Sequence, residues 1–214
     1  TEKIGALKVT SVGAGANLRL SVAESSGQGD DIILDSGSTV SGGKDVSLLA
    51  GDNITVSVGA AVTAGTVLNL TGDKPSLDPE GSIITIAGDL NASTVSITAA
   101  AGQGAKLVSS IDGNQELSNS QLKRTPASST TVQTIAIIGF TQASLAGGAS
   151  DNTMSIGGWT GSVTVDGGSG YDTITVTTDT DFNIADGLIK RVGTGDATII
   201  GIENGVFRGG AKAN

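Results

Sequence analysis

Short apolar runs, separated by Gly, Asn and Asp, fill residues 1–103 of this chain. Within a run the aliphatic residues stand at every second position, as at Ile54, Val56 and Val58. A period of two places these side chains on one face of a β-strand. Gly, Asn and Asp tolerate the positive φ angles that tight turns require. This segment is therefore predicted to consist of short strands joined at tight corners.

The strand pattern recurs at a nearly constant spacing. Similar runs begin at Asn17, Asp45, Thr66 and Thr94, so their starts are 28, 21 and 28 residues apart. One such unit cannot bury its apolar face alone, whereas stacked units can. We therefore predict an all-β fold, a right-handed parallel β-helix with coils of about 20 residues and inserted loops. An antiparallel sandwich is the alternative, because it also shows short strands at regular spacing.

Three segments interrupt the repeat. The two longer units carry extra residues after their first strand, around 25–29 and around 74–80. Residues 104–133 are polar, have no clear period and contain Pro126, which predicts a long loop, a lateral flap or a junction. Insertions at one place of a repeat form loops on one face of a solenoid. These three segments are the candidates for a lateral binding face.

A different pattern covers residues 134–214. Ile-Ile-Gly at 137–139 recurs at 199–201, an offset of 62 residues. Self-similarity at a fixed offset is typical of solenoids and arrays. We therefore predict a second solenoid zone with a 62-residue repeat, whose last copy is incomplete at Asn214.

An interrupted repeat leaves the N–H and C=O groups of its last strand without partners. The first residues of the chain also have the alternation of a strand and show no polar capping repeat. Open ends of this kind suit a slice of a longer solenoid or a subunit that polymerises head to tail. The predicted assembly edge consists of Ile4, Leu7, Val9, Val206, Phe207 and Asn214.

Composition narrows the classes of function. The chain has 33 Gly, only 3 Pro and 37% hydrophobic residues, which is enough for a packed core. Its net charge of −9 argues against binding to nucleic acid or to anionic membranes. The absence of Cys excludes disulfides and thiolate metal sites. No apolar run reaches the roughly 18 residues that membrane insertion requires.

One segment carries a pattern typical of calcium binding. Residues 167–175, Gly-Gly-Ser-Gly-Tyr-Asp-Thr-Ile-Thr, match the nonapeptide G-G-x-G-x-D-x-U-x at every specified position. The segment resembles the repeats-in-toxin (haemolysin-type) repeat of secreted bacterial proteins, which implies a calcium site at Gly168, Gly170 and Asp172. Less complete matches place Asp31 and Asp181 in the same role. The alternative is a Gly-rich corner in which Asp and Asn side chains cap the turn.

Other segments resemble bacterial surface proteins. Gly-Asp-Asn-Ile-Thr-Val at 51–56 and Gly-Asp-Leu-Asn-Ala at 88–92 are similar to coils of filamentous-haemagglutinin-type adhesins. Ile-Gly-Ile-Glu-Asn at 200–204 resembles repeats of very large bacterial surface proteins. These resemblances imply an extracellular or cell-surface location and a structural or adhesive role.

The first hypothesis is a non-enzymatic structural module that stacks end to end in a fibre, a surface layer or a longer adhesin. Its partners would be further copies or neighbouring repeats. An adhesin that binds a protein or glycan through lateral loops is the alternative. A calcium-dependent polysaccharide lyase is disfavoured, because the chain has no His and no aromatic residue before Phe140. Clustering of Asp30, Asp31, Lys44 and Lys74 on one wall would favour the lyase.

Overall fold

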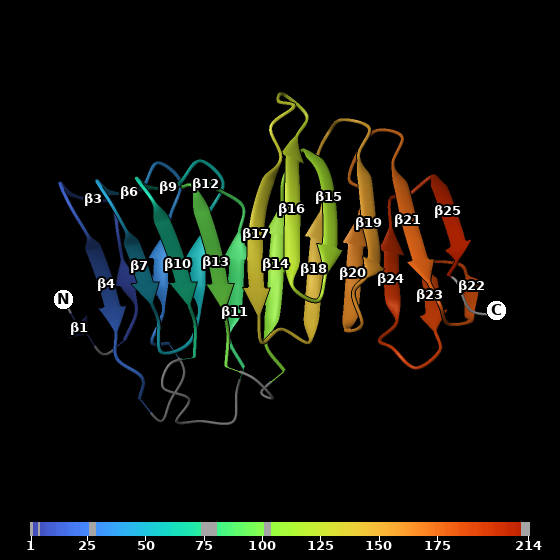
Figure 1. Ribbon diagram of the computed structural model, residues 1–214, viewed down its shortest axis with the longest axis horizontal. Helices are drawn as coiled ribbons and strands as arrows, with labels where there is room; N and C mark the ends of the chain where they lie inside the picture. Colours follow the sequence, from blue (N-terminus) through green and yellow to red (C-terminus); the bar gives the residue numbers. More distant parts are fainter. Residues whose placement is uncertain (1, 4, 26–28, 74–80, 101–103, 211–214) are drawn as a thin grey trace. The chain divides into compact units, whose positions relative to one another are not determined.

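The computed structural model describes residues 2–3, 5–25, 29–73, 81–100 and 104–210, and every helix-or-strand element among them is a β-strand (Figure 1). Most strands pair in parallel with strands that lie one coil away in the sequence. The chain divides into two compact units. The N-terminal unit contains residues 1–108 and 135–140, and the C-terminal unit contains residues 109–134 and 141–214.

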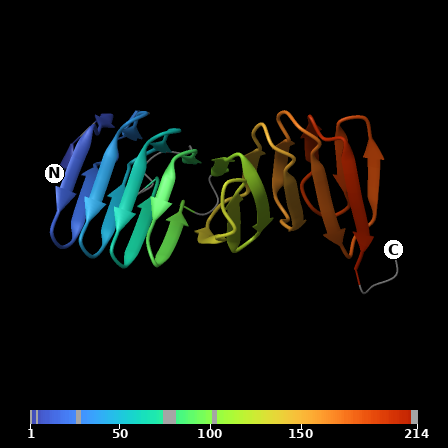
Figure 2. The ribbon, with the colours of Figure 1, turned by 90° about the horizontal axis from the view of Figure 1, so that it is seen from above.

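In the N-terminal unit the chain visits three faces in turn, and its coils follow one another in sequence order from blue to green (Figure 2). Face 1 consists of β1 (Glu2–Lys3), β4 (Leu18–Val22), β7 (Val46–Leu49), β10 (Val67–Thr71), β13 (Thr94–Thr98) and β17 (Gln133–Ile138). Face 2 consists of β2 (Leu7–Lys8), β5 (Ile32–Leu34), β8 (Ile54–Val56), β11 (Ile83–Ile86) and β14 (Lys106–Ser110), whose last two residues belong to the other unit. Face 3 consists of β3 (Ser11–Ala14), β6 (Thr39–Gly42), β9 (Ala61–Ala64) and β12 (Asp89–Asn91). This arrangement confirms the solenoid-like, parallel-strand character that the alternation predicts.

The register corrects one predicted alignment by a single residue. The spacing of run starts would place Val46 opposite Val67, but the structure pairs Val46 with Leu68. A shift of one residue turns every side chain to the other face of a strand. Val46, Leu68 and Leu70 are fully buried, whereas Val67 is half-buried. The short coil therefore has 22 residues, because that register keeps both leucines of β10 in the core.

Val58 is a second correction. The alternation places it inside with Ile54 and Val56, but β8 ends at Val56 and Val58 is 68% exposed. Gly59 follows with a φ of 79°, a left-handed conformation that Gly adopts without steric cost. The corner thus interrupts the alternation and turns Val58 outward.

The segment 104–133 is not a long loop, which is a third correction. It contains the end of the last face-2 strand and an antiparallel hairpin, β15 (Gly113–Ser118) with β16 (Gln121–Pro126). Leu117 and Leu122 are buried in this hairpin, and so are Gln115 and Arg124. The polar residues among these inward positions hide the period of two from a search for apolar alternation.

The C-terminal unit has two faces. Face 1 consists of β16, β15, β19 (Thr153–Gly158), β21 (Thr173–Thr178) and β25 (Asn204–Gly209). Face 2 consists of β18 (Gln142–Ala146), β20 (Ser162–Asp166), β24 (Ala197–Ile200), β23 (Leu188–Arg191) and β22 (Phe182–Ala185). The core between them contains inward residues such as Leu145, Met154, Val165 and Val176.

The structural period of this unit is 20 residues, and the predicted 62-residue repeat is wrong. Gln142 pairs with Ser162 and Thr153 with Thr173, which sets the period of 20. The two copies of Ile-Ile-Gly lie in different settings: residues 137–138 end β17, a face-1 strand of the N-terminal unit, whereas residues 199–200 end β24, a face-2 strand of the C-terminal unit. A tripeptide match in a chain this rich in Ile and Gly does not define a structural register.

The last coil of the C-terminal unit is closed on one face and open on the other. Strands β22 and β23 form an antiparallel hairpin, and β23 pairs with the outer edge of β24. On face 1, β25 pairs with β21 and is the last strand of its sheet in the described part of the chain. The prediction of an end without any cap is therefore wrong for face 2.

Candidate functional site

The edge of face 1 is formed by β25, which carries the predicted edge residues Val206 and Phe207. The amide of Asn204 donates to the carbonyl oxygen of Asp172, next to β21, at 3.0 Å. Because backbone groups of successive strand residues point to opposite sides, the N–H and C=O groups of Gly205 and Phe207 point away from β21. Among the described residues no further strand lies on that side.

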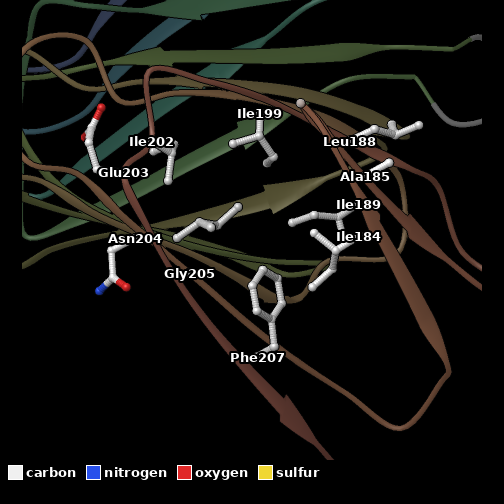
Figure 3. Close-up of a pocket in the computed structure, with 12 residues that line it drawn as sticks. Ile184, Ala185, Leu188, Ile189, Ile199, Ile202, Glu203, Asn204, Gly205 and Phe207 are labelled. Carbon is white, nitrogen blue, oxygen red and sulfur yellow. The ribbon is translucent and has the colours of Figure 1, made fainter.

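An apolar hollow of about 160 Å³ lies beside this edge, between β25 and the hairpin (Figure 3). Its lining includes Ile184, Ile189, Ile199 and Phe207. Ile184 is 50% exposed, which is unusual for a large aliphatic residue in a cluster of its own kind. The hollow forms because Gly205 occupies the inward position that Ile174 fills in the preceding strand.

Phe207 covers part of this space. A Cβ atom at Gly205 would collide with the Phe207 ring, so the ring folds back over its own strand. The ring centroids of Phe207 and Phe182 lie 5.6 Å apart, which joins β25 to the hairpin. The last coil therefore combines unpaired backbone groups with an exposed apolar cluster.

The remaining predicted edge residues lie elsewhere. Leu7 is half-buried in β2, which pairs with β5 as the first strand of face 2 in the N-terminal unit. Val9 is buried just after β2, with its amide bonded to the carbonyl oxygen of Ile33 at 3.0 Å. Ile4 and Asn214 lie outside the described residues.

The predicted calcium residue Asp172 belongs to a corner ladder, a column of polar side chains formed by Asp112, Asn152, Asp172 and Glu203. Oδ1 of Asp172 accepts the Asn152 amide at 2.6 Å, and Oε2 of Glu203 accepts the Asp172 amide at 2.7 Å. Asp112 accepts the amide and hydroxyl of Ser150, both at 3.0 Å. Each side chain thus caps a backbone amide of an adjacent coil, as in the alternative interpretation of the motif.

Gly168 and Gly170 shape the same corner. Their φ angles of 93° and 119° favour glycine, and a Cβ atom on either would meet backbone atoms of residues 148–151 in the adjacent coil. The two glycines therefore permit both the turn and the close approach of two coils.

Calcium requires six to eight oxygen ligands. Across the described residues, no group of three or more Asp, Glu, His or Cys side chains could hold a metal ion. Asp31 lies in the N-terminal unit, where Oδ1 accepts the amide of Asn53 at 3.1 Å, and Asp181 is exposed before β22. Oδ2 of Asp172 is buried and accepts no hydrogen bond. The described donors do not compose a calcium sphere, and we derive no role for the ion.

The residues named for a lyase do not gather on one wall. Asp30 is buried at the corner between faces 1 and 2, where it accepts the Gly5 amide at 2.5 Å. Lys44 lies at the corner between faces 3 and 1, and its amide donates to the carbonyl oxygen of Ala16. Lys74 lies outside the described residues.

Two of these corner carboxylates make stability depend on pH. Hydrogen bonds from the Ser150 amide lower the pKa of Asp112, and the hydroxyl of Ser25 lowers the pKa of Asp30. A carboxylate with a lowered folded-state pKa stabilises the fold fully above its unfolded value of about 3.9. That stabilisation is lost as the pH falls through the folded-state pKa.

We therefore expect urea unfolding to show a lower free energy of unfolding at pH 3 than at pH 5. The loss should be smaller in Asp112→Asn, because that variant has one fewer carboxylate to protonate. Equal losses in the variant and the wild type would show that Asp112 is not one of the responsible groups.

Arg191 is a structural residue that sequence reasoning missed. It lies on β23, is 4% exposed, and donates from Nε to Gly195 and from both terminal nitrogens to the carbonyl oxygens of Trp159 and Gly161. Burial lowers the pKa of Arg191, and the charge of Asp196 opposes that shift. The side chain ties the hairpin to the turn between β19 and β20.

A polar hollow lies on the 104–133 segment, one of the predicted lateral binding segments. Its lining includes Asn114, Thr125, Ser129 and Asp151. Oδ1 of Asp151 accepts the amide of Tyr171, whose residue is 59% exposed. These side chains are mostly engaged in the turns themselves, so the open edge of β25 is the stronger candidate site.

Within the described residues, none of the secondary structure is a helix able to cross a lipid bilayer. No protein-family model, no curated protein and no solved structure matches this chain.

Proposed function

We propose that this chain is a structural module of an extracellular or cell-surface fibre, surface layer or adhesin, without catalytic activity. Its biochemical role is to join solenoid segments through backbone hydrogen bonds at an open strand edge. The observation that carries the proposal is β25, a six-residue strand with one paired side, beside an exposed apolar hollow. Edges of this kind are templates for strand addition.

The proposal includes a right-handed coil. Each strand of the N-terminal unit reaches its parallel neighbour through a crossover over the other two faces. Connections between parallel strands of one sheet are right-handed in nearly all proteins, because strands themselves twist in that sense. The bacterial surface remains part of the proposal through the adhesin-like segments at 51–56 and 88–92.

The composition of β25 supports association. The strand Asn-Gly-Val-Phe-Arg-Gly contains no Pro and no carboxylate, and it is not bulged in its pairing with β21. Natural edge strands that avoid association commonly carry Lys, Pro or a bulge. Arg208 is the single charge on this edge, so the centre of the strand is unprotected.

Replacing Val206 by lysine tests the proposal. Val206 lies on the outer face at the middle of the edge, and its partner Thr175 lies on the same face one strand inward. Thr175→Lys therefore adds the same charge to the same face, away from the edge. In sedimentation equilibrium, the wild type and Thr175→Lys should show a mean mass that rises with concentration. Val206→Lys should need at least about tenfold higher concentration.

Two results would contradict the proposal. One is a wild-type chain that stays monomeric at every concentration. The other is association of Val206→Lys and Thr175→Lys to the same extent, because the contact would then lie away from β25.

A further inference from the structure

We infer that the partner at β25 is a second copy of this chain, paired antiparallel about a two-fold axis at Val206. The inference rests on the proposed function, since it names the occupant of the same edge. An isologous contact requires a surface that is complementary to itself. Three features of β25 meet that requirement: the direction of its backbone groups, the order of its side chains and its charge.

The backbone groups fix which residues can pair. Gly205 and Phe207 direct their N–H and C=O groups away from β21, because Asn204 directs its own toward Asp172. An antiparallel copy centred on Val206 places Gly205 opposite the partner's Phe207. Both residues of that pair have outward backbone groups, so they can exchange two hydrogen bonds. By symmetry the same exchange occurs on the other side of the axis.

The side chains are complementary in the same register. Gly205 and Phe207 both point inward, since they pair with the buried Ile174 and Val176 of β21. The register thus sets the smallest inward residue opposite the largest one, an arrangement in which an aromatic ring covers a strand glycine. On the outer face, Val206 meets the partner's Val206, and Arg208 meets the partner's Asn204.

Charge permits this contact. The chain carries a net charge of −9, so two copies repel each other at long range. The strand β25 nevertheless carries no carboxylate, and Ile184 adds exposed apolar surface beside it. Association through β25 should therefore strengthen as salt screens the net charge.

A head-to-tail contact fits less well. The N-terminal unit begins with two-residue strands on faces 1 and 2 and has three faces, whereas β25 has six residues and its unit has two faces. The hairpin also occupies the outer edge of β24, where the next coil would add to face 2. A second copy in the opposite orientation needs only the β25 edge.

Cysteine variants test the register, because the chain contains no cysteine. In the inferred pairing, residue 206 faces its own copy in a pair without hydrogen bonds, with Cα atoms about 4.5 Å apart. That separation lies within disulfide range. Residue 208 lies four positions from its own copy, about 14 Å along the strand, which is beyond that range.

Under mild oxidation Val206→Cys should form a covalent dimer at least about tenfold faster than Arg208→Cys. A mixture of Asn204→Cys and Arg208→Cys should form a mixed dimer, since those positions oppose each other. If Val206→Lys blocks association but Val206→Cys does not cross-link faster than Arg208→Cys, the two-fold inference is wrong and the edge has another partner. If the wild type does not associate at all, the proposed function fails as well.

Discussion

Replacing Arg191 by alanine is expected to lower the free energy of unfolding of the C-terminal unit by about 3 kcal/mol or more. The variant removes the donors that reach the carbonyl oxygens of Trp159, Gly161 and Gly195. Trp159 is 2% exposed, so water does not readily replace the lost donor at its carbonyl group. The hairpin should also lose its attachment to the turn between β19 and β20.

Two variants separate this effect from a loss of charge. Arg191→Lys retains the charge, but a single ammonium cannot serve three carbonyl oxygens in the fork geometry of a guanidinium, so it should lie between the wild type and Arg191→Ala. Lys190→Ala removes an exposed neighbouring charge and should change stability by less than about 0.5 kcal/mol. Urea denaturation followed by circular dichroism measures all three. A cost below about 1 kcal/mol for Arg191→Ala would contradict the assigned role.

Replacing Gly167 by alanine is the second large expected effect. An added Cβ atom would collide with the carbonyl oxygen of Gly201 in the next coil and with the Asp172 side chain. The preceding coil repeats the arrangement, since a Cβ atom at Gly147 would collide with the carbonyl oxygen of Gly167. Backbone oxygens cannot move without moving their coils apart, so we expect a cost of about 3 kcal/mol.

Gly193→Ala is the matched control for Gly167→Ala. Gly193 has open space around its Cβ position but a φ of 79°, so alanine there should cost only about 1 kcal/mol of backbone strain. Thermal unfolding of the two variants compares steric and conformational costs in one unit. Equal costs would show that coils at Gly167 have room to separate. The larger cost at Gly167 would explain the first glycine of the nonapeptide by clearance between coils.

The alternation of the first hundred residues was sufficient to predict the strands and their parallel stacking. It could not predict the register at β10, because Val67 and Leu68 are both apolar and only the packed core selects Leu68. The alternation also could not show that Val58 follows the end of a strand. Period and polarity describe a strand, whereas the corner that ends it depends on local backbone geometry.

In the C-terminal unit a usable signal was present but weaker than a misleading one. Gly147-Gly148 and Gly167-Gly168 are 20 residues apart, as are Thr153 and Thr173, and this spacing is the structural period. The Ile-Ile-Gly match at a larger offset obscured it.

The candidate site was predicted in part. Val206 and Phe207 do lie on an edge strand, because an alternating strand at a repeat's end has one unpaired side. Arg191 and the hairpin on face 2 were not predictable. An isolated Arg in a polar segment indicates an exposed side chain, and its burial depends on carbonyl oxygens some 30 residues away in the sequence. Such contacts arise only once the coils are stacked.

Amide hydrogen exchange along β25, measured in dilute and in concentrated solution, tests most directly whether this edge joins modules. The amides of Gly205 and Phe207 point away from β21, whereas those of Asn204 and Val206 point toward it. We predict that Gly205 and Phe207 exchange rapidly when dilute and slowly when concentrated, while Asn204 and Val206 stay protected in both. Rapid exchange of Gly205 and Phe207 at every concentration would contradict a joining role for this edge.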